Sequence, residues 1–119
     1  MPYLFSMKHL CRLGLLASLA TLPILSACDT DTNAVTELCA SRGNDFDFCH
    51  CYVDLMSERL DEEQFTMLAD LSRFQLSDGM DESEARDTLI GKYGMETVLA
   101  FYVYFPVPHV EAELTCPAE

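Results

Sequence analysis

The chain has few basic residues. It contains 7 Lys and Arg residues against 20 Asp and Glu residues, which gives a formal net charge of −13 over 119 residues. An acidic surface repels the phosphates of nucleic acids and the headgroups of anionic lipids. The composition therefore argues against nucleic acid as a partner. Its simplest role is to keep the surface soluble, and the main functional alternative is recruitment of a basic partner protein.

The N-terminal apolar stretch is too short for a membrane-spanning helix. A bilayer requires about 20 apolar residues, whereas residues 13–25 form a stretch of 13 residues that Gly, Ser, Thr and Pro interrupt. The charged residues that precede it, Lys8 and Arg12, are both basic. A short apolar core behind basic residues is typical of a secretory signal peptide.

Local motifs of catalysis and of cofactor binding are missing. No Ser, His and Asp residues stand at a recognised catalytic spacing, so we expect a protein that is not an enzyme. The Cys-x-x-Cys motif of thiol–disulfide oxidoreductases is absent. Phe46 stands where covalent haem attachment would require the first cysteine before Cys49-His50. The sequence thus predicts no resident cofactor.

The apolar stretch ends in the tetrapeptide Leu25-Ser26-Ala27-Cys28. It resembles the lipobox of bacterial lipoproteins, in which the cysteine is acylated and becomes the first residue after cleavage. The resemblance implies that residues 1–27 are a signal peptide that is removed, and that Cys28 carries a diacylglycerol and usually a further acyl chain. Two or more acyl chains anchor a protein stably. We therefore expect the lipid bilayer as a partner through Cys28, in a cell membrane facing the periplasm or the cell exterior.

Several points about this segment stay open. Translation could start at Met1 or at Met7, because residues from Met7 onward already make a complete signal. An ordinary secretory signal cut after Ala27 and a retained helix are the alternatives to lipidation. Asp29 favours the inner membrane over the outer one only by a species-dependent rule of enterobacterial lipoproteins.

Removal of residues 1–27 would leave a mature chain of 92 residues, enough for one small domain. That chain keeps all 20 acidic residues and five of the seven basic ones, so its formal charge is −15. Residues 28–33 are expected to form a polar, lipidated tether and residues 34–119 a helical domain. An even number of cysteines in a small exported domain predicts two disulfides. The four candidates are Cys39, Cys49, Cys51 and Cys116.

Helix signals recur along the domain. A first helix is expected over residues 34–42 and a second over about residues 45–60, with a glycine-containing turn between them. Asp61 followed by Gln64 is a capping-box pattern that predicts a third helix. The same pattern begins at Asp81 and predicts a fourth helix.

The C-terminal part is less regular. Residues 95–105 are rich in strand-forming side chains, but a strand needs a partner and the rest of the domain offers none, so we expect a buried helix. Pro106 and Pro108 predict an extended passage, after which residues 109–116 return to the body. The fold class is therefore all-α, a small domain of four to five helices cross-linked by two disulfides.

Helical geometry constrains the cysteine pairing. Residues two apart on a helix point about 200° away from each other, so Cys49 and Cys51 cannot both face Cys39. Cys39 and Cys49 flank the predicted turn and are separated by nine residues. We predict Cys39–Cys49 with Cys51–Cys116, and the alternative Cys39–Cys51 with Cys49–Cys116 stays open. The spacing of the first pair resembles half of the twin cysteine-x9-cysteine pattern of the coiled-coil-helix-coiled-coil-helix family.

The run of residues 47–54, Asp-Phe-Cys-His-Cys-Tyr-Val-Asp, is similar to one in small exported helical bacterial proteins of unknown function. That resemblance implies cross-linked helices and no activity. The function we expect is a non-catalytic interaction or accessory role for a membrane-anchored envelope lipoprotein. The alternative is an envelope copper- or zinc-binding protein that uses Cys49-His50-Cys51, since thiolates and imidazole suit those metals.

Overall fold

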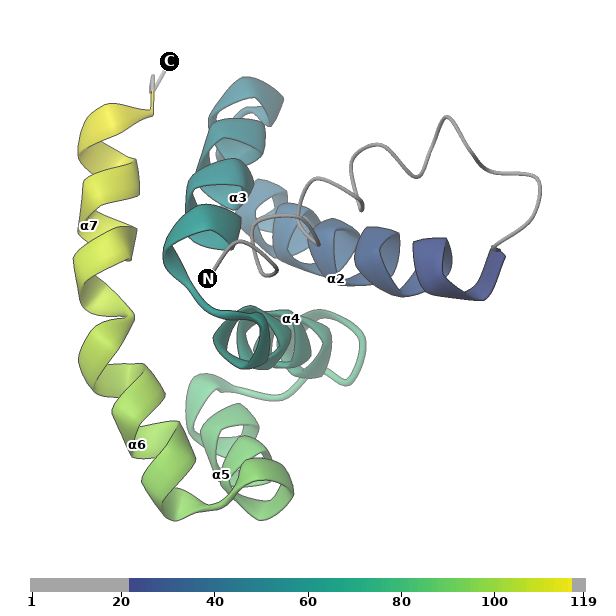
Figure 1. Ribbon diagram of the computed structural model, residues 1–119, viewed down its shortest axis with the longest axis vertical. Helices are drawn as coiled ribbons and strands as arrows, with labels where there is room; N and C mark the ends of the chain where they lie inside the picture. The colour runs from purple at the N-terminus through teal and green to yellow at the C-terminus, as the bar shows by residue number, and fades with distance from the viewer. Residues whose placement is uncertain (1–21, 117–119) are drawn as a thin grey trace.

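The computed structural model describes residues 22–116, and for residues 22–29 it describes the helical backbone only. This part of the chain is all-α, as predicted, and contains no strand. Its helices are α2 (Leu22–Ser41), α3 (Phe46–Arg59), α4 (Glu62–Leu76), α5 (Glu82–Tyr93), α6 (Met95–Tyr104) and α7 (Pro106–Thr115). Only Phe105 separates α6 from α7, and Figure 1 shows the two as one bent arm along the side of the molecule.

Aspartate side chains cap the N-termini of the central helices. The Asp45 side chain accepts a hydrogen bond from the Phe48 amide at the start of α3. Both predicted capping boxes are present, at Asp61 for α4 and at Asp81 for α5, and each satisfies two backbone amides that would otherwise lack a partner. Gly94 closes α5 with φ 92°, a conformation that favours glycine.

Two boundary predictions are wrong. The first helix begins at Leu22 and not at residue 34, so residues 28–33, which we expected to form a tether, are part of α2. No glycine or proline follows Pro23 within α2, and proline is tolerated in a first helical turn. Pro106 and Pro108 likewise lie in the first turn of α7, where the amides they lack would have no helical partner. The expected extended passage is therefore helix.

Helix α4 lies at the centre of the domain. It packs against α2 on one side and α5 on another, and it also contacts α3. The arm lies along the outside, with α6 against α5 and α7 against α3 (Figure 1). Side chains from all these helices meet in one core, whose largest fully buried members include Val35, Met56, Leu60, Met67, Leu89 and Phe101. The inner face of the arm is thereby held facing α2, α3 and α4.

Candidate functional site

Both disulfides form bonds between helices. Cys39–Cys49 joins α2 to α3, and Cys51–Cys116 joins α3 to the residue that ends α7, each with a Cα–Cα distance of 5.7 Å. The predicted pairing is confirmed, and the alternative pairing is wrong. Cys49 and Cys51 leave α3 in different directions, so one reaches α2 and the other reaches the arm.

Both disulfides use cysteine sulfurs that copper or zinc binding at Cys49-His50-Cys51 would require as free thiolates. Cys49 and Cys51 carry no free thiol. His50 lies exposed between them, and its ring packs edge-on against Phe46 with centroids 4.4 Å apart. Among the side chains that the structure describes, no three His, Cys, Asp or Glu residues are placed to hold a metal ion.

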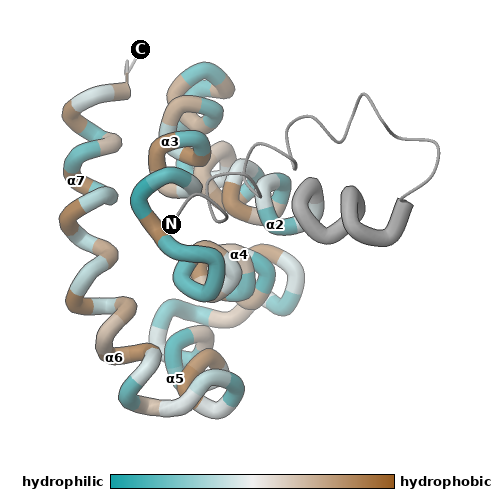
Figure 2. Tube along the Cα trace, viewed as in Figure 1, coloured by the Kyte–Doolittle hydropathy of each residue, from teal (hydrophilic) through white to brown (hydrophobic). Residues whose placement is uncertain are grey.

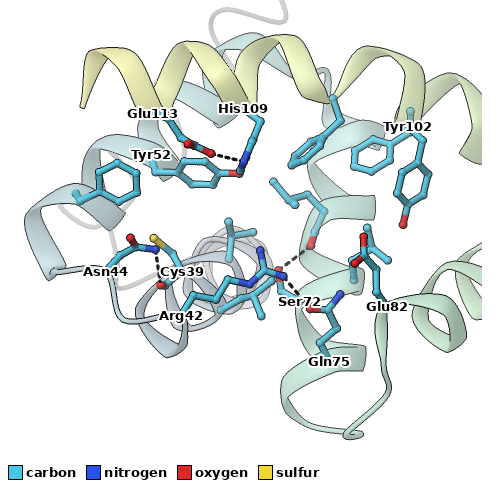
Figure 3. A pocket seen from close by; sticks show the side chains of 17 residues that line it. Cys39, Arg42, Asn44, Tyr52, Ser72, Gln75, Glu82, Tyr102, His109 and Glu113 are labelled. Atoms are coloured by element: carbon cyan, nitrogen blue, oxygen red, sulfur yellow. Dashed lines mark hydrogen bonds and ion pairs between the residues drawn. The ribbon is translucent and has the colours of Figure 1, made fainter. Parts of the chain in front are cut away.

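A cavity of about 550 Å³ lies between the inner face of the arm and helices α2, α3 and α4 (Figure 3). Its volume falls within the range of small-molecule sites, roughly 300–1,000 Å³. Apolar and aromatic side chains supply much of the lining, and polar groups stand on both walls. The main apolar lining residues are Val35, Leu38, Phe48, Leu68, Phe101 and Phe105.

One wall of the cavity carries a chain of hydrogen bonds from α7 to α3. The Tyr52 hydroxyl lies 2.8 Å from Nδ1 of His109, and Nε2 of the same ring lies 2.6 Å from a carboxylate oxygen of Glu113. Because an ionised carboxylate can only accept, His109 donates to Glu113 through Nε2. In a neutral imidazole, Nδ1 is then the acceptor for the Tyr52 hydroxyl. Figure 3 shows Tyr52 and Glu113 both beside His109.

Burial determines the protonation state of the Tyr52 phenol. Burial raises the pKa of the Tyr52 phenol well above its usual range; the positive charge of Arg42 opposes the shift and Glu113 adds to it. A phenol with so high a pKa keeps its proton at neutral pH and is a poor nucleophile. The Tyr52–His109–Glu113 hydrogen bonds therefore link the arm to α3 through a protonated phenol.

The opposite wall carries a cation. Arg42, which follows α2, donates from Nη2 to the side-chain oxygen of Gln75 on α4 at 3.1 Å. Figure 3 shows Arg42 and Gln75 on the far side of the hollow from His109. One wall of the cavity thus carries Tyr52, His109 and the carboxylate of Glu113, and the other carries a guanidinium group.

A second polar cluster joins three helices outside the cavity. Asp70 on α4 is almost fully buried and accepts hydrogen bonds from Lys92 and Tyr93 on α5, each at 2.7 Å. Arg73 contacts Asp70 at 3.1 Å and reaches Asp31 on α2 at 2.5 Å. Burial by itself would raise the pKa of Asp70, but the donors and positive charges around it outweigh burial and lower that pKa. The cluster is a structural tie.

The outer face of the arm is apolar and exposed. Its side chains recur every three or four residues along α6 and α7, and they are between 52% and 82% exposed. Brown turns mark this hydrophobic sequence along the arm in Figure 2. We call these residues the outer stripe: Met95, Leu99, Val103, Val107, Val110 and Leu114.

Most of the predicted lipid signal lies outside the described residues. Residues 1–21 are not described, and Cys28 is described only as a backbone position within α2. Within residues 22–116, no helix is long and apolar enough to cross a bilayer. The predictions of cleavage and of lipidation at Cys28 stay predictions.

Sequence reasoning missed three features of this region. Tyr52 and His109 are 57 residues apart, and Arg42 and Gln75 are 33 apart, so no local pattern connects them. The outer stripe did carry a signal, because its three- and four-residue spacing is helical. The stripe was not identified from the sequence, because we expected an extended segment at Pro106.

Comparison with protein-family models, with curated proteins and with solved structures gave no match.

Proposed function

We propose that this chain is a lipid-anchored lipoprotein of the bacterial envelope that acts by binding a partner protein and performs no catalysis. The motif Leu25-Ser26-Ala27-Cys28 supports the anchor, with Cys28 as the acylated residue. Two disulfides in a small domain support an oxidising compartment outside the cytoplasm. The Tyr52 phenol, kept protonated by its raised pKa, agrees with a role without covalent catalysis.

The observation that carries the binding role is the outer stripe. Residues 97–108 include no charged side chain, although 23% of the whole chain is charged. Exposed apolar side chains that gather in one patch mark interaction surfaces, whereas single ones are ordinary. The arm is also fixed in place, by Cys51–Cys116 and by a two-fold hydrogen-bonded ion pair between Arg59 and Glu111 at 2.8 and 2.9 Å. A rigid surface loses little conformational freedom when a partner docks.

Charge selects the kind of partner. Glu96 and Glu113 are exposed beside the two ends of the outer stripe, and the mature chain would carry a formal charge of −15. A second copy of this chain would bring the same negative charge to the interface, and an anionic bilayer surface would do likewise. The complementary occupant is an envelope protein with an apolar surface flanked by Lys or Arg.

The anchor is tested by intact-mass measurement and membrane fractionation of the chain expressed in a bacterial host. We expect the wild type in the membrane fraction, with the mass of residues 28–119 plus acyl chains. Cys28→Ser should leave an unacylated chain with its signal peptide uncut, because the acylated cysteine is what the lipoprotein peptidase recognises. A wild-type protein that is soluble and has the mass of its polypeptide alone would refute the anchor.

The docking face is tested by crosslinking in the native membrane. Val103→Gln with Val107→Gln should abolish a defined crosslinked product, because both side chains are highly exposed and central in the outer stripe. Phe46→Gln is the matched control, since Phe46 is 65% exposed but lies on α3, away from the stripe. The product should also weaken at high salt, as charge steering predicts. A product that survives the double substitution, or that proves to be a homodimer, contradicts the proposed partner.

A further inference from the structure

Arg42 differs from the other cations of the described chain in having no carboxylate partner. The other four Lys and Arg residues of residues 30–116 each have a carboxylate oxygen within 4.0 Å. Arg42 instead has only the neutral oxygen of Gln75, although acidic residues outnumber basic ones almost threefold in the whole chain. A guanidinium presents donors in a fork that matches a carboxylate. Its anion-binding capacity is thus unused by the described protein.

Arg42 also lines the cavity. Figure 3 shows it across the hollow from Tyr52, which lines the same cavity. Phe48, Phe101 and Phe105 lie among the apolar lining residues. Polar and apolar side chains share the lining, and small-molecule sites combine apolar walls with polar groups that fix the orientation of the ligand.

We propose that this cavity binds a small amphipathic carboxylate, whose anionic head pairs with Arg42 and whose alkyl or aryl part lies against the phenylalanine rings of the arm. The Tyr52 hydroxyl, held by His109, faces the same space and supplies a neutral hydrogen-bonding group. This site faces inward from the arm and does not depend on the partner that the outer stripe binds or on the lipid at Cys28.

The charges of the cavity set the orientation of the ligand. Glu82 lines the cavity near Tyr102, away from Arg42 (Figure 3). A carboxylate is repelled from Glu82 and from Glu113 on the α7 wall and is attracted to Arg42, so the head lies at the Arg42 end. The apolar part then extends toward Phe101 and Tyr102. A cationic or neutral amphiphile of the same size lacks this preference.

The test is titration of the full chain, held in phosphatidylcholine nanodiscs, with octanoate, followed by calorimetry against empty nanodiscs. Octanol and octylamine are the neutral and cationic comparison ligands. We expect octanoate to bind about tenfold more tightly than either comparison ligand, because a charge-assisted pair forms only with the carboxylate. Arg42→Gln should remove this difference, and Arg42→Lys should retain part of it because the charge stays.

Arg86→Gln is the matched control, because it changes the net charge equally at a residue outside the cavity lining. It should leave octanoate binding unchanged. Side-chain NMR signals of Phe101 and Tyr52 should shift on addition of octanoate, which localises the ligand. Three outcomes would overturn the proposal: no octanoate binding above empty nanodiscs, equal binding of octanol, or equal loss of affinity in Arg42→Gln and Arg86→Gln.

Discussion

At the scale of single residues, Asp70 is the carboxylate on which the packing of three helices depends. Its side chain is only 8% exposed, yet it is ionised, because Lys92, Tyr93 and Arg73 together compensate for its burial. Arg73 carries the connection onward to Asp31 on α2. Removing the charge would leave the cations of Arg73 and Lys92 without their shared partner, a larger loss than that of an exposed ion pair.

We predict that Asp70→Asn lowers the free energy of unfolding by about 1–3 kcal/mol at pH 7, the usual range for losing hydrogen bonds to a buried charged group. The pKa of Asp70 is lower in the folded chain than its ordinary value. Its contribution to stability is therefore present above about pH 4, the ordinary pKa of Asp, and is lost as the pH falls through the lower folded pKa. Urea unfolding between pH 7 and pH 2 measures both effects.

Asp87→Asn serves as the control, because Asp87 is exposed and lies at 4.0 Å from Arg86. It should change stability by less than about 1 kcal/mol. If wild type and Asp70→Asn lose stability in parallel below pH 4, Asp70 is not the group whose ionisation stabilises the fold.

At the scale of elements, the arm is defined by how it begins. Gly94 ends α5 and precedes α6 with φ 92° and ψ 150°, a backbone region that residues with a side chain rarely adopt. No atom lies within 4 Å of where a Cβ would stand at Gly94, so the requirement for glycine comes from the backbone conformation and not from crowding. The angle between α5 and the arm depends on this residue.

We predict that Gly94→Ala destabilises the protein by about 1–3 kcal/mol, the cost of forcing a side chain into that conformation. Gly91→Ala is the control in the same helix. Gly91 has no positive φ and no atom near its Cβ position, so this substitution should stabilise by about 0.5–1 kcal/mol. Thermal unfolding of both variants would show midpoints moving in opposite directions, and a shared direction would contradict this account of Gly94.

Local chemistry made many of the elements predictable. The capping patterns at Asp61 and Asp81 act within three residues, so the sequence alone located the starts of α4 and α5. The extended passage predicted at Pro106 is wrong because a proline breaks a helix interior but fits a first helical turn. No local pattern indicates which of these positions Pro106 occupies.

The cavity was beyond sequence reasoning for a different reason. Its walls come from helices that are far apart in the chain, and the contact of Tyr52 with His109 follows from how α7 packs on α3. In the sequence Arg42 is one basic residue among seven, and only the structure shows that it has no carboxylate partner within the described part of the chain. Periodicity predicts which face of a helix is buried, but it does not predict which helix covers that face.

At the scale of the whole molecule, the two disulfides constrain very different lengths of chain. Cys39–Cys49 closes a separation of 10 residues, whereas Cys51–Cys116 closes one of 65. Crosslinking a longer loop removes more conformational entropy from the unfolded chain.

We predict that the double substitution Cys51→Ala with Cys116→Ala costs about 4 kcal/mol of stability, against about 3 kcal/mol for Cys39→Ala with Cys49→Ala, on the loop-entropy scale. Guanidinium unfolding of the two variants beside the wild type measures the difference. The first variant should also weaken protection of α7 amides from hydrogen exchange, because Cys116 ends that helix. A larger cost for the shorter loop would show that strain or packing, and not chain entropy, decides the contribution of each bond.

The spacing of the bonds also sets an order of maturation. In an oxidising compartment, Cys39 and Cys49 can pair as soon as the α2–α3 hairpin has formed, since 10 residues separate them. Cys51 cannot form its native bond until α4, α5, α6 and α7 have all followed, because its partner is 65 residues further on. Until then no covalent bond joins the arm to α3, so the cavity wall that the arm supplies is the last part of the domain to be crosslinked.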